Sequence, residues 1–258
     1  MELHHFPSGD IKLEAIHNSF RLCLGDTVII TGDIFHHMAH VLRLKMGARL
    51  SLSDGNGHEY VGSISRIDGE SLAVKLEEFS IAPAAETGPK ITLFQGLPKG
   101  DKLEWILQKC TELGAAEIVP FVAALSVSRP AAGRIPEKLE RWRRIALEAA
   151  RQSRRMTVPQ VTFAADLSEV CRQADHPVKL LLWEEEQTGS LRRLLAGVRS
   201  PERIAVIVGP EGGLTSEEVA CALKCGFISV SLGNRIVRTE TAGLAILAIL
   251  QFHWGDIG

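Results

Sequence analysis

The sequence predicts an α/β protein of two domains, a small β-rich domain followed by a larger one with a mainly parallel sheet. The first 80 residues show short strand patterns, in which apolar and polar residues alternate, and one helix pattern. From Lys90 onward, apolar strand patterns alternate with helix patterns, an order typical of a parallel sheet covered by helices. Residues 81–89, rich in Ala, Pro and Gly, have the composition of a linker. We therefore expect domains at 1–80 and 90–258.

The short strands of the first domain suggest a small β-barrel. The segment Asp54-Gly55-Asn56-Gly57 is a strong turn signal between two of these strands. Asp33 can act as the N-cap of the single helix, whose apolar residues then fall on one face. That face consists of Ile34, Met38, Val41 and Leu42, and the expected strands are 27–30, 49–53, 60–67 and 71–79.

Strands and helices alternate through the second domain. Its last helix is apolar on every side, which indicates burial all round. No apolar run approaches the ~20 residues that a membrane span needs. The expected strands are 91–95, 118–121, 178–183, 204–208 and 228–232, and the expected helices are 101–113, 136–153, 215–225 and 239–254.

The composition is that of a soluble globular protein, with 45% hydrophobic and 23% charged residues. Its N-terminus lacks the basic and apolar segments of a signal peptide, so we expect a cytoplasmic protein without a membrane partner. The net charge of −2 disfavours an RNA partner, but residues 90–160 hold 13 basic and 7 acidic side chains. Because nucleic acid responds to the local charge, this region is a candidate RNA-binding surface.

Five cysteines are scattered along the chain, an odd number that argues against a disulfide framework. Cys221 and Cys225 stand four apart on an expected helix, as metal ligands also can. Since no second ligand pair stands at a zinc-like spacing, we expect structural thiols and no metal. His36, His37 and His40 have no acidic partner in register and are expected to be structural or RNA-facing.

Three glycine-containing loops follow strands of the second domain, where open α/β sheets bind ligands. In the second loop, Gly212 and Gly213 permit a tight turn and a close approach of a ligand to backbone amides. Thr215 and Glu218 then form a capping box for the next helix. An ordinary strand-to-helix turn is the alternative interpretation. The three loops span 95–102, 208–215 and 232–243.

Two arginines of the third loop, Arg235 and Arg238, precede the most apolar helix of the chain, and Glu240 follows at its N-terminus. Glu240 could simply complement the helix dipole. The arginines favour a function, because a charge entering an apolar element is costly without a partner. The motifs of NTPase phosphate loops, dinucleotide-binding folds, serine hydrolases and zinc proteases are all absent from the sequence.

These loops together resemble the RsmE family, which methylates N3 of a uridine in 16S ribosomal RNA. The specific combination is Ile207-Val-Gly-Pro-Glu-Gly-Gly213 with Leu232-Gly-Asn-Arg-Ile-Val-Arg-Thr-Glu-Thr-Ala242. The resemblance extends over nearly the entire chain. Segments 36–47 and 54–55 resemble the family's PUA-like N-terminal domain, and 99–104, 109–114 and 148–154 resemble its central segments. One departure is Leu3-His4-His5-Phe6, where family members usually carry an arginine, so the effect on an N-terminal RNA contact stays open.

The resemblance implies a SPOUT domain, an α/β fold with a deep trefoil knot, that forms a homodimer. It implies that the second and third loops enclose S-adenosyl-L-methionine. For the methyl transfer we hypothesise that Arg238 stabilises charge on the uracil and that Glu240 or Glu211 orients the base or accepts its proton. The chemistry agrees, because glycine loops expose backbone groups to the adenine and a sulfonium favours nearby carbonyl or carboxylate oxygens. The residues expected to bind the cofactor are Leu182, Trp183, Gly209, Pro210, Glu211, Gly212, Gly213, Leu232, Gly233, Arg235, Ile236 and Thr241.

The partner implied by the resemblance is 16S ribosomal RNA or the small ribosomal subunit. The basic segment 141–155 agrees, because its arginines recur at helical spacing opposite Trp142, Ile145 and Ala149. A merely solvated charged face is the alternative. The residues expected to bind RNA are Arg43, Lys45, Lys99, Lys102, Arg144, Arg151 and Arg155.

Two other functions stay open, 2′-O-ribose methylation by a knotted relative and RNA binding without catalysis. The motif Arg238-Thr-Glu-Thr-Ala242, where ribose-methylating relatives have Ser-Leu-Asn, counts against ribose methylation. Retention of both cofactor loops counts against the second. The general base, the exact target nucleotide and the form of the substrate, naked RNA or assembled subunit, stay open as well.

Overall fold

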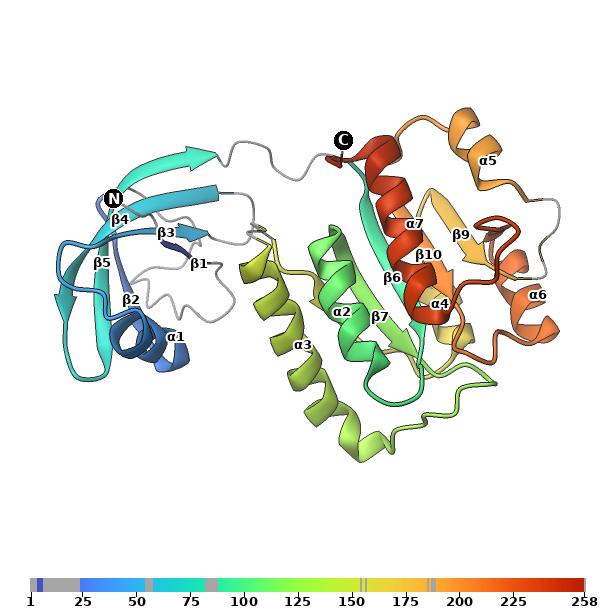
Figure 1. Ribbon diagram of the computed structural model, residues 1–258, viewed down its shortest axis with the longest axis horizontal. Coiled ribbons are helices and arrows are strands. Elements are labelled where there is room, and N and C mark those ends of the chain that lie inside the picture. Colours follow the sequence, from blue (N-terminus) through green and yellow to red (C-terminus); the bar gives the residue numbers. More distant parts are fainter. Residues whose placement is uncertain are drawn as a thin grey trace. The chain divides into compact units, whose positions relative to one another are not determined.

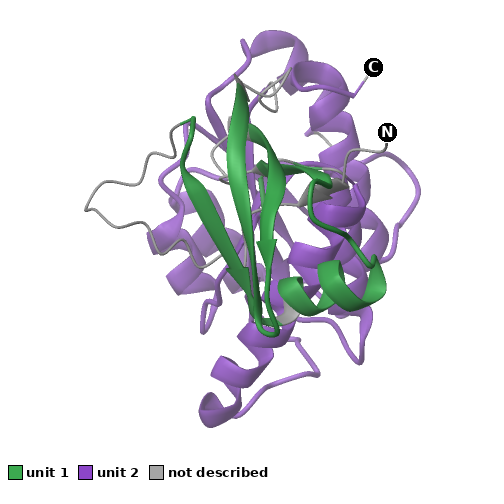
Figure 2. Ribbon diagram, turned by 90° about the vertical axis from the view of Figure 1, so that its left-hand side faces the viewer, with its two compact units in different colours: residues 1–85, 154–158 green, residues 86–153, 159–258 purple. Residues whose placement is uncertain are grey.

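The computed structural model describes residues 4–6, 24–53, 58–81, 88–153, 155, 157–184, 186 and 189–257 (Figure 1). The chain divides into two compact units, coloured in Figure 2. The first comprises residues 1–85 and 154–158, and the second comprises 86–153 and 159–258. The expected turn at Asp54–Gly57 lies outside the described residues, as does most of the expected linker.

A five-stranded sheet with the order β1-β3-β4-β5-β2 forms the first unit. Its core contains the fully buried side chains of Ile30, Met38 and Leu50. β1 pairs parallel with β3, and the other pairs are antiparallel. The strands are β1 (His4–Phe6), β2 (Thr27–Thr31), β3 (Arg49–Ser53), β4 (His58–Ile67) and β5 (Ser71–Ile81).

The helix of this unit differs from the one expected. α1 (Gly32–His36) begins before Asp33, so that residue lies inside the helix rather than at its N-cap. The chain then widens into a π-helical turn, η2 (His37–Val41), in which the Leu42 amide donates to the His37 carbonyl. The wider turn rotates later residues out of register. Met38 is therefore buried, whereas Val41 is 63% exposed, and the expected apolar face ends early.

A six-stranded sheet with the order β11-β9-β10-β6-β7-β8 forms the second unit, and every neighbouring pair is parallel. The predicted parallel sheet is thus confirmed, with strand bounds close to those expected. The strands are β6 (Lys90–Gly96), β7 (Ala115–Phe121), β8 (Gln160–Val161), β9 (Val178–Leu182), β10 (Arg203–Val208) and β11 (Ile228–Val230).

Helices cover both faces of this sheet (Figure 1). Alternate residues of β10 divide between the two apolar layers, with Val206 on one face and Ile207 on the other. The first face is covered by α2 (Lys102–Glu112), α3 (Ile135–Gln152), α5 (Leu191–Gly197) and α7 (Thr239–Trp254), and the second by α4 (Leu167–Gln173) and α6 (Ser216–Lys224). A short 3₁₀ turn, η3 (Ala132–Arg134), precedes α3.

The four longest helices agree with the prediction to within one residue at each end, whereas α4 and α5 were missed because each is only seven residues long. The predicted capping box of Thr215 and Glu218 is present at the start of α6. Of the helices in the described ranges, none combines the length and apolarity that crossing a bilayer requires.

Candidate functional site

A cavity of about 1450 Å³ opens at the carboxyl ends of β9, β10 and β11. Parallel sheets bind ligands at this edge because the loops that follow the strands gather there. The second and third glycine loops supply much of its wall, with contributions from the segment after β9 and from α5 and α7. Two of the three loops predicted to hold a ligand therefore meet at one cavity.

Hydrogen bonds of Thr239 join the segments that surround the cavity. The Thr239 hydroxyl donates to the Gly209 carbonyl at 2.6 Å, and Gln95 Nε2 donates to the Thr239 hydroxyl oxygen at 2.9 Å and to the Gly96 carbonyl at 3.0 Å. Gln95 is fully buried and Thr239 nearly so. The end of β6, the second loop and the start of α7 are thus tied together at one point.

The first and second loops pass so closely that only glycine fits at Gly96. A Cβ atom there would lie 2.6 Å from Pro210 Cδ and 2.7 Å from Pro210 N. Both distances are below any real Cβ contact, and Pro210 is held by the second loop. Gly96 therefore allows the backbone of β6 to approach the loop that lines the cavity.

Within the second loop, the two central glycines face different neighbours. Gly213 lines the cavity, and its positive φ of 73° favours glycine because other side chains are strained there. A Cβ atom on Gly212 would instead lie 3.0 Å from Leu125 Cβ, and Gly212 does not line the cavity. Glu218 braces the same region, because its Oε1 accepts a hydrogen bond from the Ala124 amide at 2.8 Å.

The third loop leaves the sheet through a turn at Gly233, whose φ is +116°. The Ser231 hydroxyl holds this turn by donating to the Gly233 carbonyl and accepting from the Gly233 amide. Beyond the turn, Ile236 is 87% exposed although it lines the cavity. In the segment after β9, Glu184 and Glu186 also line the cavity.

A chain of ion pairs runs along one side of the cavity. Lys102 Nζ lies 2.8 Å from Glu211 Oε1 and 3.5 Å from Glu240 Oε2, and Glu211 also accepts from the Lys99 amide at 3.2 Å. Arg238 Nη1 lies 3.9 Å from Glu240 Oε1. At 3.5 Å, Lys102 and Glu240 form an ion pair without a good hydrogen bond, and Glu240 Oε2 is buried without a hydrogen-bond partner.

These pairs shift the pKa values of Lys102 and Glu211. The hydrogen bond to Glu211 raises the pKa of Lys102 above its usual value, so the ammonium is held charged. Partial burial acts to raise the pKa of Glu211, but the hydrogen bonds from Lys102 and from backbone amides outweigh it and lower that pKa. Glu211 is therefore held as a carboxylate and is a poor proton acceptor.

Arg238 corrects one step of the sequence argument. Its side chain is 83% exposed, so the inference that its charge enters an apolar environment is wrong. Arg238 is the residue before α7, of which only one side is buried, through residues such as Ile246 and Leu250. The expectation that this helix is buried all round is wrong, because Ile249 is 37% and Phe252 72% exposed. Arg238 also forms a loose ion pair with Glu240. Arg238 nevertheless lines the cavity.

Most residues predicted to bind the cofactor lie at the cavity, but Gly212 and Thr241 do not. The buried threonine is Thr239, two residues before the exposed Thr241. Sequence reasoning also missed Gln95, a polar residue at the end of an apolar strand, which was the signal that could have identified it. The predicted residues at the cavity are Leu182, Trp183, Gly209, Pro210, Glu211, Gly213, Leu232, Gly233, Arg235 and Ile236. Of the catalytic set, Arg238 and Glu211 line the cavity, whereas Glu240 does not.

The residues predicted to bind RNA are divided between the two units. Arg43 and Lys45 are exposed in the first, and Lys99 and Arg144 are exposed in the second. Arg155 is only 7% exposed and donates to the Thr157 hydroxyl. The expectation that it shares an exposed helix face is wrong, because α3 ends at Gln152. Arg151 pairs with Glu148 at 2.7 Å, and Lys102 faces the cavity.

Comparison with known proteins places the chain in a family. Residues 86–251 match the model of the RNA methyltransferase domain, and residues 30–77 match that of the RNA methyltransferase PUA domain. The Bacillus subtilis ribosomal RNA small subunit methyltransferase E is 33% identical over 232 residues, which are 88% of this chain and 90% of the relative. The chain belongs to this family of RNA methyltransferases.

Solved structures agree over the whole length. The Neisseria gonorrhoeae ribosomal RNA small subunit methyltransferase E, bound to S-adenosyl methionine, matches with a TM-score of 0.81 at 30% identity, covering 100% of both chains. A Legionella pneumophila methyltransferase in complex with bound SAM matches with a TM-score of 0.82 at 28% identity, covering 99% of this chain and 98% of the other. The predicted fold class, a SPOUT domain preceded by a PUA-like domain, is confirmed.

Replacing Thr239 by Val should lower the stability of the second unit, because Gly209 O and Gln95 Nε2 would lose their shared partner in a buried place. A buried group left without a hydrogen bond costs about 1–3 kcal/mol. Urea unfolding of the parent, Thr239→Val and the matched control Thr241→Val, which changes an exposed residue of the same helix, measures the difference. Equal losses in the two variants would contradict the assignment.

Proposed function

We propose that this protein is a cytoplasmic enzyme that transfers the methyl group of S-adenosyl-L-methionine to N3 of a uridine in 16S ribosomal RNA of the small subunit. The observation that carries the proposal is the cavity at the carboxyl ends of β9, β10 and β11, walled by the two loops that bear the family motifs. The Bacillus subtilis and Neisseria gonorrhoeae relatives are named ribosomal RNA small subunit methyltransferases, and two solved neighbours hold SAM. Both facts support methyl transfer from this cofactor to ribosomal RNA, and the position N3 rests on the resemblance of the loop motifs.

The residues at the cavity fit this cofactor. Glycines at 209, 213 and 233 leave backbone groups open to an adenine, and Leu182 and Trp183 supply an apolar wall. The carboxylates of Glu184 and Glu186 complement a ligand that carries positive charge on sulfonium and ammonium groups. When bound, the cofactor supplies an electrophilic methyl group.

Two cations of this chain, Arg238 and Lys102, line the cavity where the base would be methylated. Uracil N3 is a poor nucleophile until it loses its proton, and the negative charge then spreads to the neighbouring oxygens. A hydrogen bond from a guanidinium to such an oxygen is stronger when the base is an anion than when it is neutral. The guanidinium therefore lowers the barrier to methyl transfer. Arg238 suits this role because its exposed side chain can reach a bound base.

Glu240 is the better candidate for accepting the N3 proton. Glu211 accepts from Lys102 and from the Lys99 amide, and its pKa is lowered, so it binds a proton weakly. Glu240 Oε2, in contrast, has no hydrogen-bond partner in the described structure. Its other oxygen lies 3.9 Å from Arg238, which places the proposed acceptor beside the proposed anion-stabilising group.

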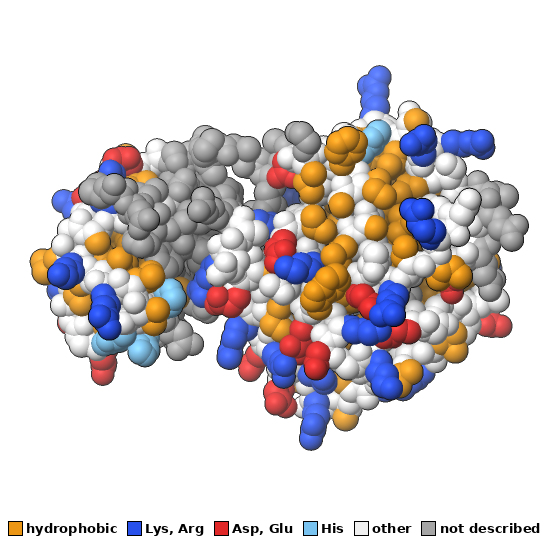
Figure 3. Space-filling view, in the orientation of Figure 1, with side chains coloured by type: hydrophobic (Ala, Val, Ile, Leu, Met, Phe, Trp, Pro, Cys, Tyr) orange, Lys and Arg blue, Asp and Glu red, His pale blue; other side chains and the backbone are white. Residues whose placement is uncertain are grey.

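A homodimer is part of the proposal. Exposed apolar side chains gather over α7 and the loop before it, where Figure 3 shows hydrophobic surface. Phe252 is 72% exposed, Ile236 87%, Ile249 37% and Val237 36%. Contiguous apolar surface of this kind marks interaction sites. All four residues line the cavity, so a second copy of the chain would cover it, and the molecular mass in solution checks this.

The reaction is tested by incubating the protein with ribosomal RNA or small subunits and labelled S-adenosyl-L-methionine, followed by mass analysis of the nucleosides. We expect 3-methyluridine, and we expect it only in 16S RNA. A 2′-O-methylated nucleoside would show that the enzyme methylates ribose instead. Cofactor binding without any methylated product would favour RNA binding without catalysis.

Changing Arg238 to Lys should slow methyl transfer while cofactor affinity changes little, because lysine keeps the charge but loses the planar fork of donors. Loss of one such donor typically costs about 10²–10³ in rate. Single-turnover methylation with saturating cofactor measures this rate. The matched control is Arg199→Lys, which changes an exposed arginine outside the cavity. Parental turnover by a folded Arg238→Lys enzyme would remove Arg238 from the catalytic role.

RNA affinity should fall with salt despite the net negative charge, and α3 should contribute through Arg144. We expect Arg144→Ala to reduce the slope of log K against log salt by about one, since one phosphate contact is lost. Arg172→Ala, an exposed arginine of α4 on the opposite face of the sheet, is the control and should leave the slope unchanged. The same slope in all three proteins would leave α3 as a merely solvated surface.

A further inference from the structure

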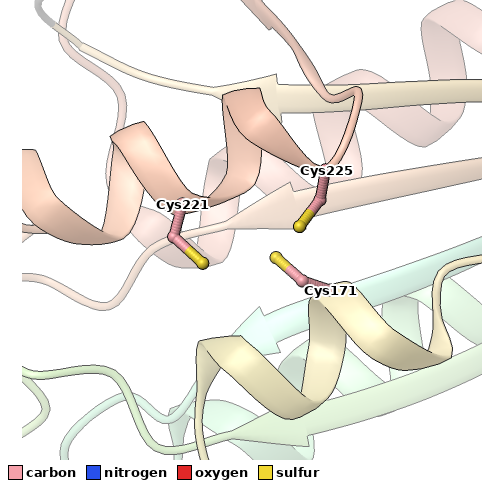
Figure 4. Close-up of side chains that lie close together, drawn as sticks. All are labelled: Cys171, Cys221 and Cys225. Carbon is pink, nitrogen blue, oxygen red and sulfur yellow. The ribbon is translucent and has the colours of Figure 1, made fainter.

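Three cysteines from two helices converge on the face of the sheet that α4 and α6 cover. Cys171 lies on α4, Cys221 on α6, and Cys225 is the C-cap residue of α6. Their sulfur atoms lie within 4.8 Å of one another, and Figure 4 shows all three side chains pointing into the space between the helices. All three side chains are partly buried.

We propose that Cys171, Cys221 and Cys225 form a binding site for one soft, thiophilic metal ion, Cu(I) or Zn(II). Two thiolates that bind the same ion at ~2.3 Å each are at most about 4.6 Å apart, and about 3.8 Å apart at a tetrahedral angle. The three sulfur atoms are therefore already almost close enough to share an ion. A disulfide would use two of them and leave the third without a role.

The donor set determines the class of ion. In the described ranges, the group contains three sulfur atoms and no imidazole or carboxylate. Hard cations such as Mg²⁺ and Ca²⁺ require oxygen ligands, whereas thiolates select Cu(I) and Zn(II). Cu(I) is satisfied by three thiolates. Structural zinc takes four ligands, so Zn(II) at this site would keep a water molecule as the fourth.

Without an ion, the Cys171 side chain is a neutral thiol. Burial, followed by the neighbouring Cys225 and Cys221 sulfur atoms, raises the pKa of Cys171 to about 12. An incoming ion has to displace protons, and the resulting negative charge has to be compensated. Besides the ion itself, Lys179 can contribute, because its ammonium group donates to the Cys225 carbonyl at 3.1 Å.

The site is separate from the cavity of the proposed function, since none of the three cysteines lines that cavity. An ion there would join α4 to α6, which are in contact and contribute Val170, Val219 and Ala222 to the same apolar layer. A ligand that binds only the folded state raises stability in proportion to the logarithm of its concentration over its Kd. Bound metal should therefore raise the melting temperature of the protein.

The test uses full-length protein, reduced and freed of metal, and kept without oxygen. One arm titrates Cu(I) against a chromophoric Cu(I) chelator, and the other titrates Zn(II) against a zinc chelator. We expect one equivalent of at least one ion to bind with a rise in Tm, and the arm with the tighter binding identifies the ion. Cys171→Ser should weaken binding by more than about 100-fold, beyond the 10–100-fold typical of losing a residue that only supports a ligand.

Two controls make the result decisive. Cys23→Ser removes a cysteine outside the proposed site and should bind the ion like the parent. Cys171→Ala, with circular dichroism and melting in the absence of metal, separates loss of the ligand from loss of the fold. Absence of binding in both arms, or equal binding by the parent and a folded Cys171 variant, would overturn the proposal. So would a disulfide between Cys171 and Cys221 or Cys225 in a protein that takes up neither ion.

Discussion

A single threonine hydroxyl joins three segments that are far apart in the sequence. Thr239 is 30 residues from Gly209, to whose carbonyl it donates, and 144 residues from Gln95, from which it accepts. The cavity depends on this arrangement, because its walls are the loops whose origins Thr239 holds together. The close approach of Gly96 to Pro210 requires the same arrangement, since the two backbones leave no room for a side chain.

The charged side chains near Thr239 are positioned by ion pairs with one another rather than by burial. The sequence argument took an arginine before an apolar helix to be a buried charge, but an apolar helix can begin in solvent. Arg238 is exposed, whereas Glu240, the second residue of the helix, is largely covered. Lys102, which sequence reasoning assigned to RNA, lies between Glu211 and Glu240 instead. The net charge of its segment did not reveal the partners of Lys102, because these carboxylates lie 109 and 138 residues away in the sequence and only the fold brings them close.

How much could be predicted depends on the range of the interactions. The long helices and five of the six strands of the parallel sheet follow from local periodicity, so their ends were predicted to within three residues, whereas the two-residue β8 was missed. A helix as short as α4 contains too few turns for its hydrophobic periodicity to be detected. The π-helical turn at His37–Val41 interrupts the α-helical periodicity that the sequence analysis had continued through it. Cys171 was not joined to the Cys221 and Cys225 pair for a related reason. It lies 50 residues before Cys221, and only the packing of α4 on α6 brings it there.

The buried polar side chain of Gln95 beside the cavity lowers the stability of the fold. Gln95 Oε1 is buried and has no hydrogen-bond partner, although Nε2 of the same side chain donates twice. A Cβ atom on Gly243 would lie 3.4 Å from that oxygen, so the glycine lets α7 pack tightly over it. An apolar residue at position 95 would avoid the unsatisfied oxygen but would also release Thr239. Folds retain such groups mainly at functional sites, where a fixed arrangement of loops outweighs about 1–3 kcal/mol of stability. The buried Gln95 therefore supports the same conclusion as the cavity, that this end of the sheet is where the protein acts.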